Sequence, residues 1–213
     1  MSVTQILLIR HGETDWNVVK RFQGHIDIAL NATGLAQAQL LASALADHAI
    51  DVIYSSDLQR AHVTAQAIAE QKQLAVQLTP QLRERHYGIF EGLTGAEIES
   101  QHPEHFPAWI ARDPQHQIPK GESLQAFYDR ITSVLIELAQ QHPAQTIVVV
   151  AHGGVLDCIY RHATKTALHE PRKAPLLNTS LNRLRYANGA LEIVQWGDVS
   201  HLQTQARDEI GPI

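Results

Sequence analysis

The sequence predicts an α/β fold: a three-layer sandwich whose central sheet is mostly parallel, with helices on both faces and an antiparallel edge hairpin. Two observations predict it. Short apolar runs alternate along the chain with segments whose apolar residues recur at helical spacing, which is typical of a parallel sheet crossed by helices. Near the C-terminus two further runs flank Asn188-Gly189, a dipeptide favoured in tight hairpin turns.

Short apolar runs predict the strands. The first run, Gln5–Ile9, has four consecutive apolar residues, which is typical of a strand covered on both faces. The third run, Ala75–Leu78, is ended by Pro80, because proline cannot donate a hydrogen bond to a sheet ladder. After Gln5–Ile9, the predicted strands in chain order are Val52–Tyr54, Ala75–Leu78, Thr146–Ala151, Leu181–Tyr186 and Leu191–Trp196.

Helical periodicity predicts two helices in the first third of the chain. Asn31–His48 has Asn31 or Thr33 as its candidate N-cap, and Ser56 or Asp57 is the candidate cap of the second helix. Their expected buried faces consist of small and aliphatic residues: Leu35, Ala38, Leu41 and Leu45 in the first helix, and Leu58, Ala61, Ala65 and Ile68 in the second.

Two more helices are predicted later. Ser123–Gln140 has the most regular apolar spacing, at i, i+3 and i+4, and Val155–His162 follows a Gly-Gly pair. Between the two halves, Leu93–Gly121 breaks the alternation of strands and helices, with four prolines and short helical stretches. We expect one domain over residues 1–213, with an insertion at 93–121 that covers the site. The polar stretch His201–Ile213 is expected to be loosely ordered.

Composition excludes several classes of function. The 213 residues are 44% apolar and 18% charged, which suits a globular domain, and the formal net charge of −5 argues against nucleic acid as a partner. The single cysteine, Cys158, excludes an internal disulfide and a cysteine-based zinc site. Because no apolar stretch approaches the ~20 residues that span a bilayer, we expect a cytoplasmic protein without membrane contact.

Charged side chains follow three predicted strands at the point where each strand ends. Arg10 and His11 follow the first strand, Arg60 lies in the first turn of the helix after the second, and His152 follows Thr146–Ala151. In open α/β sheets, ligands bind beyond the carboxyl ends of the strands. We therefore expect two arginines and two histidines to meet at one edge of the sheet.

These side-chain types suit an anion with a nucleophile beside it. Guanidinium groups bind tetrahedral oxyanions, most often phosphate, and the helix N-termini after Ser56 and Gly153 are expected to add N–H donors. An imidazole that is neutral near pH 7 can attack as a nucleophile. A leaving alcohol also needs a proton donor, and Glu84 in the loop after Ala75–Leu78 is the candidate.

The motifs around these residues match one family in order. Leu8–Thr14, which contains Arg10-His11-Gly12, resembles the RHG signature of the histidine phosphatase superfamily, in its phosphoglycerate-mutase-like branch. Further segments resemble the branch's other motifs in the correct order: Phe22–Gly24, Ser55–Ala61, Leu82–Arg85, Pro119–Ser123 and Val149–Gly154. The resemblance extends from about residue 5 to residue 160.

The resemblance implies a role for each residue at this edge. His11 would attack phosphorus and become a phosphohistidine, and Glu84 would protonate the leaving oxygen and then, as a carboxylate, activate water. The phosphoryl oxygens would be held by Arg10, Arg60, His152 and Asn17. No metal and no cofactor is implied.

Weaker signals indicate contacts to the rest of the substrate. Gln23 and Gly24 lie in the matched loop after the nucleophile. Glu13 would orient an arginine, share proton transfer or support the loop. Within the insertion, Trp109 is either core or a substrate contact, and Arg112 is the only arginine.

The same phosphohistidine can transfer its phosphoryl group to water or to a second hydroxyl. The glycolytic mutases of this branch carry a longer insertion with an Arg-Arg pair, whereas Leu93–Gly121 is short and has no such pair. This departure favours a phosphomonoester hydrolase that acts on small phosphorylated metabolites. A cofactor-dependent phosphoglycerate mutase is the alternative, and a non-catalytic phosphate-binding module is a more remote one. The oligomeric state stays open, with a homodimer through an exposed strand as one alternative.

Overall fold

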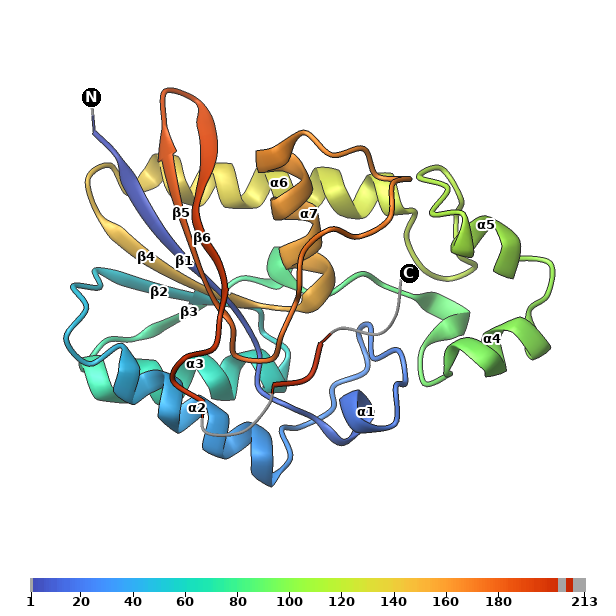
Figure 1. Ribbon diagram of the computed structural model, residues 1–213, viewed down its shortest axis with the longest axis horizontal. Coiled ribbons are helices and arrows are strands. Elements are labelled where there is room, and N and C mark those ends of the chain that lie inside the picture. The colour runs from blue at the N-terminus through green and yellow to red at the C-terminus, as the bar shows by residue number, and fades with distance from the viewer. Residues whose placement is uncertain (1, 203–205, 209–213) are drawn as a thin grey trace.

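The computed structural model describes residues 2–202 and 206–208, so most of the expectation for His201–Ile213 lies outside the described residues. Six strands form one sheet in the order β3-β2-β4-β1-β5-β6. None of the helices in these ranges is both long enough and apolar enough to cross a membrane. Figure 1 shows helices on both sides of the twisted sheet.

The first four strands are parallel. The central strands β1 (Thr4–Arg10) and β4 (Thr146–Ala151) pair from Gln5 beside Thr146 to Arg10 beside Ala151. β2 (Val52–Ser55) pairs with β4, and the short β3 (Val76–Leu78) ends the sheet on that side. Because these strands run in one direction, their carboxyl ends meet at the same edge, as predicted.

The other side of the sheet is antiparallel. β5 (Leu181–Ala187) runs against β1, and β6 (Ala190–Asp198) forms the outer strand. Asn188 and Gly189 join them with φ angles of 55° and 79°, which the tight hairpin turn requires. The predicted edge hairpin is therefore confirmed. Since β5 runs opposite to β1, its first residues lie at the carboxyl edge of the parallel strands.

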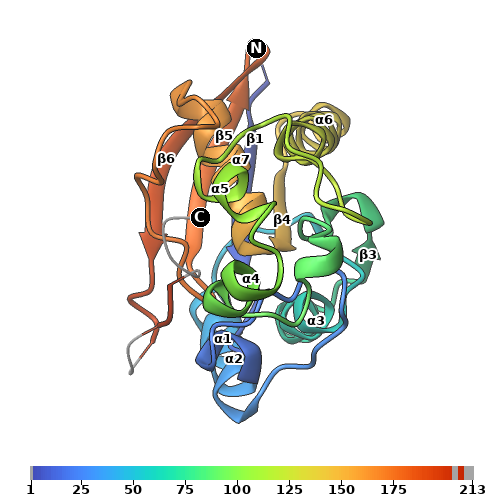
Figure 2. The same cartoon turned by 90° about the vertical axis from the view of Figure 1, so that its right-hand side faces the viewer.

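Two apolar clusters make the three layers. On one face of the sheet, α6 (Leu124–Gln141) and α7 (Gly153–Thr164) bury their apolar stripes. On the other face, α2 (Ala32–Ala44) and α3 (Gln59–Lys72) pack against Leu7, Ile9 and Val148. Figure 2 views the sheet between these two helical layers.

Two local predictions were wrong. Leu35 does not join the buried face of α2 but is exposed, because the helix turns Gly34 and Gln37 inward instead. The α3 helix has Leu58 at its N-cap without a side-chain cap, so neither Ser56 nor Asp57 caps it. Asn31 does cap α2, with its side chain accepting a hydrogen bond from the Gly34 N–H.

Short elements complete the chain at the carboxyl edge. α1 (Asp15–Val18) follows the end of β1 directly, and the segments Pro80–Leu82 and Gly88–Phe90 are single 3-10 turns. The segment 93–121 contains α4 (Gly95–Gln101) and α5 (Phe106–Ile110) at the end of the molecule toward which the parallel strands point (Figure 1). A third apolar cluster anchors it: Phe22, Phe90, Ile98, Trp109 and Ile118.

Candidate active site

His11 occupies the first position after β1 and is only 3% exposed. Its Nδ1 lies 2.7 Å from the carbonyl oxygen of Gly12. A carbonyl can only accept, so Nδ1 carries the proton and the Nε2 lone pair is left for an electrophile. Burial lowers the pKa of His11 well below its usual range, and the charges of Arg60 and Arg10 lower it further. The ring is therefore neutral at pH 7.

The loop that carries His11 is held by residues from distant parts of the chain. Asn178 donates its side-chain N–H to the His11 carbonyl at 2.9 Å, and the Thr179 N–H donates to the Arg10 carbonyl at 3.0 Å. The Gly12 N–H donates to Thr64 Oγ1 at 3.1 Å. These contacts fix the backbone beside the imidazole, which is a condition for a precisely placed nucleophile.

Arg10 and Arg60 bring two fully buried guanidiniums to the same place. Arg10 donates to the Leu176 carbonyl at 2.5 Å, and Arg60 donates to the carbonyls of Gly24 and Ile26 at 2.8 and 3.0 Å. Both charges act on His11 and on His152, which places them beside both imidazoles. Two guanidiniums beside two imidazoles are a combination of side chains suited to binding a phosphoryl group.

His152 caps α7 at the end of β4 and is completely buried. Its ring centroid lies 5.3 Å from that of His11, with the planes tilted by 60°. Within the described part of the chain, neither ring nitrogen of His152 has a hydrogen-bond partner. Burial lowers the pKa of His152 well below its usual range, and so, to a lesser degree, do Arg60, His11 and Arg10. A neutral imidazole with unpaired nitrogens is thus available to a ligand.

Asn17 belongs to the capping box of α1. Its Oδ1 accepts from the Thr14 N–H and hydroxyl at 3.0 and 3.1 Å, and Asn17 is buried beside His11. Because the amide oxygen is occupied in this way, the amide nitrogen is the atom that can donate to a ligand. The capping box therefore orients the donor that the sequence predicted.

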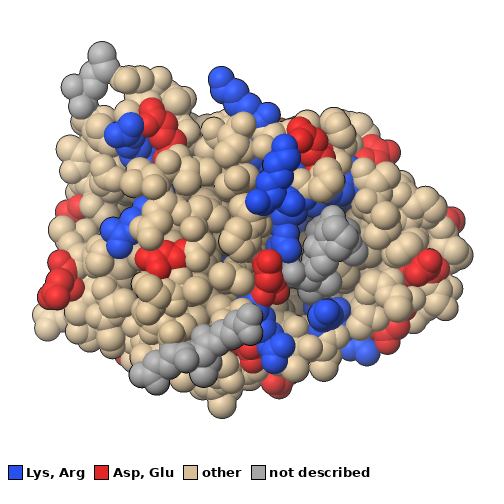
Figure 3. Space-filling view, viewed as in Figure 1, with Lys and Arg blue, Asp and Glu red and all other residues tan. Residues whose placement is uncertain are grey.

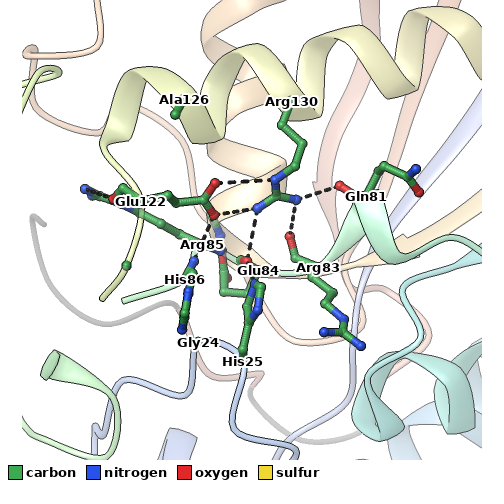
Figure 4. Close-up of polar contacts among 12 residues, drawn as sticks. Gly24, His25, Gln81, Arg83, Glu84, Arg85, His86, Glu122, Ala126 and Arg130 are labelled. Carbon is green, nitrogen blue, oxygen red and sulfur yellow. Dashed lines mark hydrogen bonds and ion pairs between the residues drawn. The ribbon is translucent and has the colours of Figure 1, made fainter. Parts of the chain in front are cut away.

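Glu84 reaches the site from the irregular segment between the two 3-10 turns. Its Oε1 accepts from the Arg85 N–H at 2.8 Å and its Oε2 accepts from the Gly154 N–H at 2.9 Å. The carboxyl group is 6% exposed and lines the same cleft as His11. Figure 4 shows the backbone of this segment crossed by polar contacts from α6.

The N-termini of α3 and α7 each bind a carboxylate of the protein itself. They were expected to add N–H donors to an anion site, and one early amide of each helix is engaged in this way. Gln59 N–H donates to Asp27 at 2.7 Å and Gly154 N–H donates to Glu84. The favourable interaction of a carboxylate with a helix N-terminus accounts for this pairing.

Two adjoining pockets receive these groups. The smaller is lined by His11, Asn17, Arg21, Phe22, Gln23, Arg60, Glu84 and Tyr87. The larger shares Phe22 and Tyr87 with it and continues to Trp109, Arg112, Arg85 and Asp157. Figure 3 shows Lys and Arg side chains gathered near the centre of this face of the molecule. A ligand could therefore place an anionic group in one pocket and its remainder in the other.

The weaker substrate candidates separate into two groups. Gln23, Trp109 and Arg112 line the pockets, and Trp109 is also part of the third apolar cluster. Gly24 and Glu13 instead support neighbours. The Gly24 carbonyl accepts from Arg60, and Glu13 accepts from Asn31 at 3.0 Å and from Arg207 at 2.7 Å.

Sequence reasoning missed Asn178 and Thr179, which bind the backbone of the nucleophile loop. They precede β5, and the first residues of an antiparallel strand lie at the carboxyl edge of its parallel neighbour. That rule, applied to the predicted hairpin, could have found them. No cluster of three or more His, Cys, Asp or Glu side chains within residues 2–202 and 206–208 is arranged to hold a metal.

Comparison with known proteins agrees with this geometry. The family model of the histidine phosphatase superfamily (branch 1) matches residues 6–199. The chain is 42% identical to phosphoglycerate mutase-like protein 4 of Arabidopsis thaliana over 95% of this chain and 89% of that relative. It is 38% identical to the metal-independent phosphoserine phosphatase of the same plant, over 95% of this chain and 85% of that protein.

Among solved structures, the phosphoserine phosphatase of Entamoeba histolytica in complex with 3-phosphoglyceric acid superimposes with a TM-score of 0.81. The match has 28% identity and covers 93% of this chain and 98% of that one. Both the predicted fold class and the predicted family are confirmed. The chain belongs to the histidine phosphatase superfamily, branch 1.

Proposed function

We propose that this protein hydrolyses small phosphomonoesters through a phosphohistidine formed on Nε2 of His11. One observation carries the proposal. A neutral imidazole with its Nε2 lone pair available lies beside two buried guanidiniums and a second neutral imidazole. A phosphoryl group needs this combination, because its transition state spreads negative charge over three oxygens while a nucleophile approaches in line.

In the first step, His11 Nε2 attacks phosphorus and the bond from phosphorus to the substrate alcohol breaks. Arg10, Arg60, His152 and Asn17 hold the phosphoryl oxygens. Glu84, protonated on one oxygen, gives that proton to the leaving alcohol. The two Glu84 oxygens accept the backbone N–H groups of Arg85 and Gly154, which hold the carboxyl group in place for this transfer.

In the second step, water replaces the alcohol. The Glu84 carboxylate takes a proton from this water, whose oxygen attacks phosphorus while the bond to His11 Nε2 breaks. Inorganic phosphate leaves, and both residues regain their starting protonation states. The same geometry therefore serves both steps, with Glu84 first as acid and then as base.

The larger pocket supports a leaving group that carries its own negative charge. Arg85 is 6% exposed and, among the described residues, forms no ion pair with a carboxylate, donating instead to the Glu122 carbonyl. Arg112 shares the Asp157 carboxylate with Arg161. Because buried positive charge exceeds negative charge here, a substrate carboxylate would be stabilised. Phosphoserine and phosphoglycerate, which two relatives' names and titles mention, have this chemistry.

We propose hydrolysis as the main reaction, with mutase activity as the second candidate. The short segment 93–121 has one arginine and one lysine, and relatives named phosphoserine phosphatase support hydrolysis. We also propose that residues 1–213 act as one domain and that 93–121 covers the site, since Trp109 and Arg112 line the larger pocket. Phosphate release from phosphoserine and from 3-phosphoglycerate, measured beside 3- to 2-phosphoglycerate interconversion, tests the choice. Fast interconversion with negligible phosphate release would reverse it.

A further inference from the structure

The backbone that carries Glu84 belongs to no helix and no strand. Residues 83–87 lie between two 3-10 turns, so no ladder of regular hydrogen bonds fixes them. A general acid must nevertheless stay within hydrogen-bond distance of the oxygen it protonates. The position of Glu84 must therefore depend on contacts from outside the segment.

Arg130 of α6 supplies these contacts along one side of the segment. Its Nη1 donates to the carbonyls of Gln81 and Arg83 at 2.6 and 3.0 Å, and its Nη2 donates to the Glu84 carbonyl at 3.3 Å. Figure 4 shows the guanidinium fork lying across these carbonyls. One planar group thus binds three carbonyl oxygens within residues 81–84 and fixes their positions relative to one another.

Glu122 orients the fork and binds the segment on its other side. Its carboxylate accepts from Arg130 at 2.6 Å, and its Oε1 also accepts from the His86 N–H at 2.9 Å. The Glu122 N–H donates to the His86 carbonyl at 2.9 Å, and its carbonyl accepts from Arg85. Residues 83–87 are therefore held between Arg130 of α6 and Glu122, which directly precedes the N-cap of that helix.

His25 also reaches the Glu84 backbone. His25 lies 3.0 Å from the Glu84 carbonyl through Nε2 and stacks on His86, with ring centroids 4.5 Å apart. Since the carbonyl can only accept, Nε2 of His25 is the donor. Arg130 and His25 therefore share one acceptor. Arg130 also binds the carbonyls of Gln81 and Arg83, which His25 does not reach.

We propose that Arg130, oriented by Glu122, is a positioning residue for the general acid Glu84. This inference rests on the proposed phosphohistidine reaction. Removing Arg130 leaves the carbonyls of residues 81, 83 and 84 without their guanidinium donor, so the segment relaxes and the carboxyl group moves from the leaving oxygen. A displacement of about 1 Å can reduce a rate about 100-fold. The loss falls on steps that need proton transfer, while the phosphate site beside β1 and β4 is unchanged.

Leaving-group dependence tests the proposal. We compare the rate of enzyme phosphorylation by phosphoserine, whose alkoxide needs a proton to leave, with that by 2,4-dinitrophenyl phosphate, whose phenolate does not. For Arg130→Met we expect the rate with phosphoserine to fall about 10- to 100-fold, while the dinitrophenol burst stays within about twofold of wild type. Met keeps an unbranched aliphatic side chain at this position but removes the guanidinium, whose carbon lies 5.1 Å from the centroid of the Phe127 ring.

Three further variants make the result specific. Glu84→Gln should give the same pattern, and Glu122→Gln a weaker form of it, because the amide no longer pairs with Arg130 as an ion. Arg185→Met removes the exposed Arg185–Glu192 pair of the edge hairpin and should leave both rates unchanged. Equal losses with both donors in Arg130→Met would overturn the proposal in favour of a general structural role, and so would no loss with either. Absence of phosphoenzyme in the wild type would instead contradict the proposed function.

Discussion

The imidazoles of His11 and His152 lie 5.3 Å apart between centroids, tilted by 60°, and both are buried. Two protonated rings at this distance, beside two guanidiniums, would repel one another strongly. The protein keeps both rings neutral through burial and the nearby arginine charges, which lower the pKa of each. Two neutral imidazoles beside two guanidiniums thus suit the binding of a phosphoryl group.

This arrangement predicts a loss of stability in mild acid. The pKa of each histidine is lower in the folded chain than in the unfolded chain, so the unfolded chain binds more protons below about pH 6.5. The free energy of unfolding should therefore decrease as the pH falls below about 6.5. From about pH 5.5 downward its slope should approach a limit of about 1.4 kcal/mol per pH unit for each histidine, until the folded-state pKa is reached. Urea unfolding between about pH 7.0 and about pH 4.5 measures this slope.

A matched pair of variants shows which histidine causes this dependence of the free energy of unfolding on pH. His152→Gln should remove about 1.4 kcal/mol per pH unit of it, whereas substitution of the exposed His169 by Gln should leave it unchanged. A slope that is the same in wild type and in His152→Gln would show that the buried ring does not titrate as proposed.

Glu84→Gln separates the two chemical steps. The amide cannot exchange a proton with alcohol or water, so turnover of phosphoserine should fall about 100- to 10,000-fold. With an activated donor, the first step proceeds and the second lacks its base, so phosphoenzyme should accumulate. Rapid-quench measurement of labelled protein detects this, and a variant that hydrolyses phosphoserine at the wild-type rate would exclude Glu84 as the acid.

Gly154 gives a steric test of the same carboxylate. A Cβ at Gly154 would overlap Glu84 Oε1 and come within 3.0 Å of the Phe127 ring, so Gly154→Ala should displace the acid and lower kcat about 10-fold or more. Gly95, in the first turn of α4, has open space around its Cβ position, and Gly95→Ala should add about 0.4–1 kcal/mol of stability. Thermal unfolding and kcat are measured for both variants. Normal turnover by Gly154→Ala would contradict the placement of Glu84 beside Gly154 as the acid.

The larger pocket predicts which part of the substrate Arg85 recognises. Arg85→Gln should raise KM for phosphoserine about 10-fold or more, because a charge-assisted hydrogen bond contributes about 1.5–3 kcal/mol. Phenyl phosphate, which has no carboxylate, should lose much less. Equal KM changes for the two substrates would show that Arg85 does not bind a substrate carboxylate.

The sequence predicted the framework of the site well, because the carboxyl-edge rule depends only on where strands end. It placed Arg10, His11, Arg60 and His152 together, and the structure brings all four to one edge. It could not find Arg130, whose partners are backbone carbonyls of an irregular segment. Periodicity specifies faces of helices and strands. It gives no information on where a loop carbonyl points.

Leu35 and Gly154 show two further limits. Leu35 is apolar and at helical spacing, yet α2 turns Gly34 and Gln37 inward, where Gly34 meets the Glu13 backbone and Gln37 accepts the Glu13 N–H. The helix N-terminus after Gly153 was expected to add N–H donors for an anion, and its Gly154 N–H donates to the Glu84 carboxylate. Helical periodicity and the attraction of anions to helix N-termini both hold here. The groups that meet α2 and α7, Glu13 and Glu84, come from other segments of the chain.

The site of phosphorylation tests the central claim most directly. The protein is incubated with labelled phosphoserine, quenched in alkali, and the phosphorylated residue and nitrogen are assigned by mass spectrometry and phosphorus NMR. Because Nδ1 of His11 donates to the Gly12 carbonyl, the account predicts an acid-labile phosphate on Nε2 of His11, absent from His11→Asn. Phosphate on Nδ1, on His152, or on no residue while hydrolysis continues would contradict it.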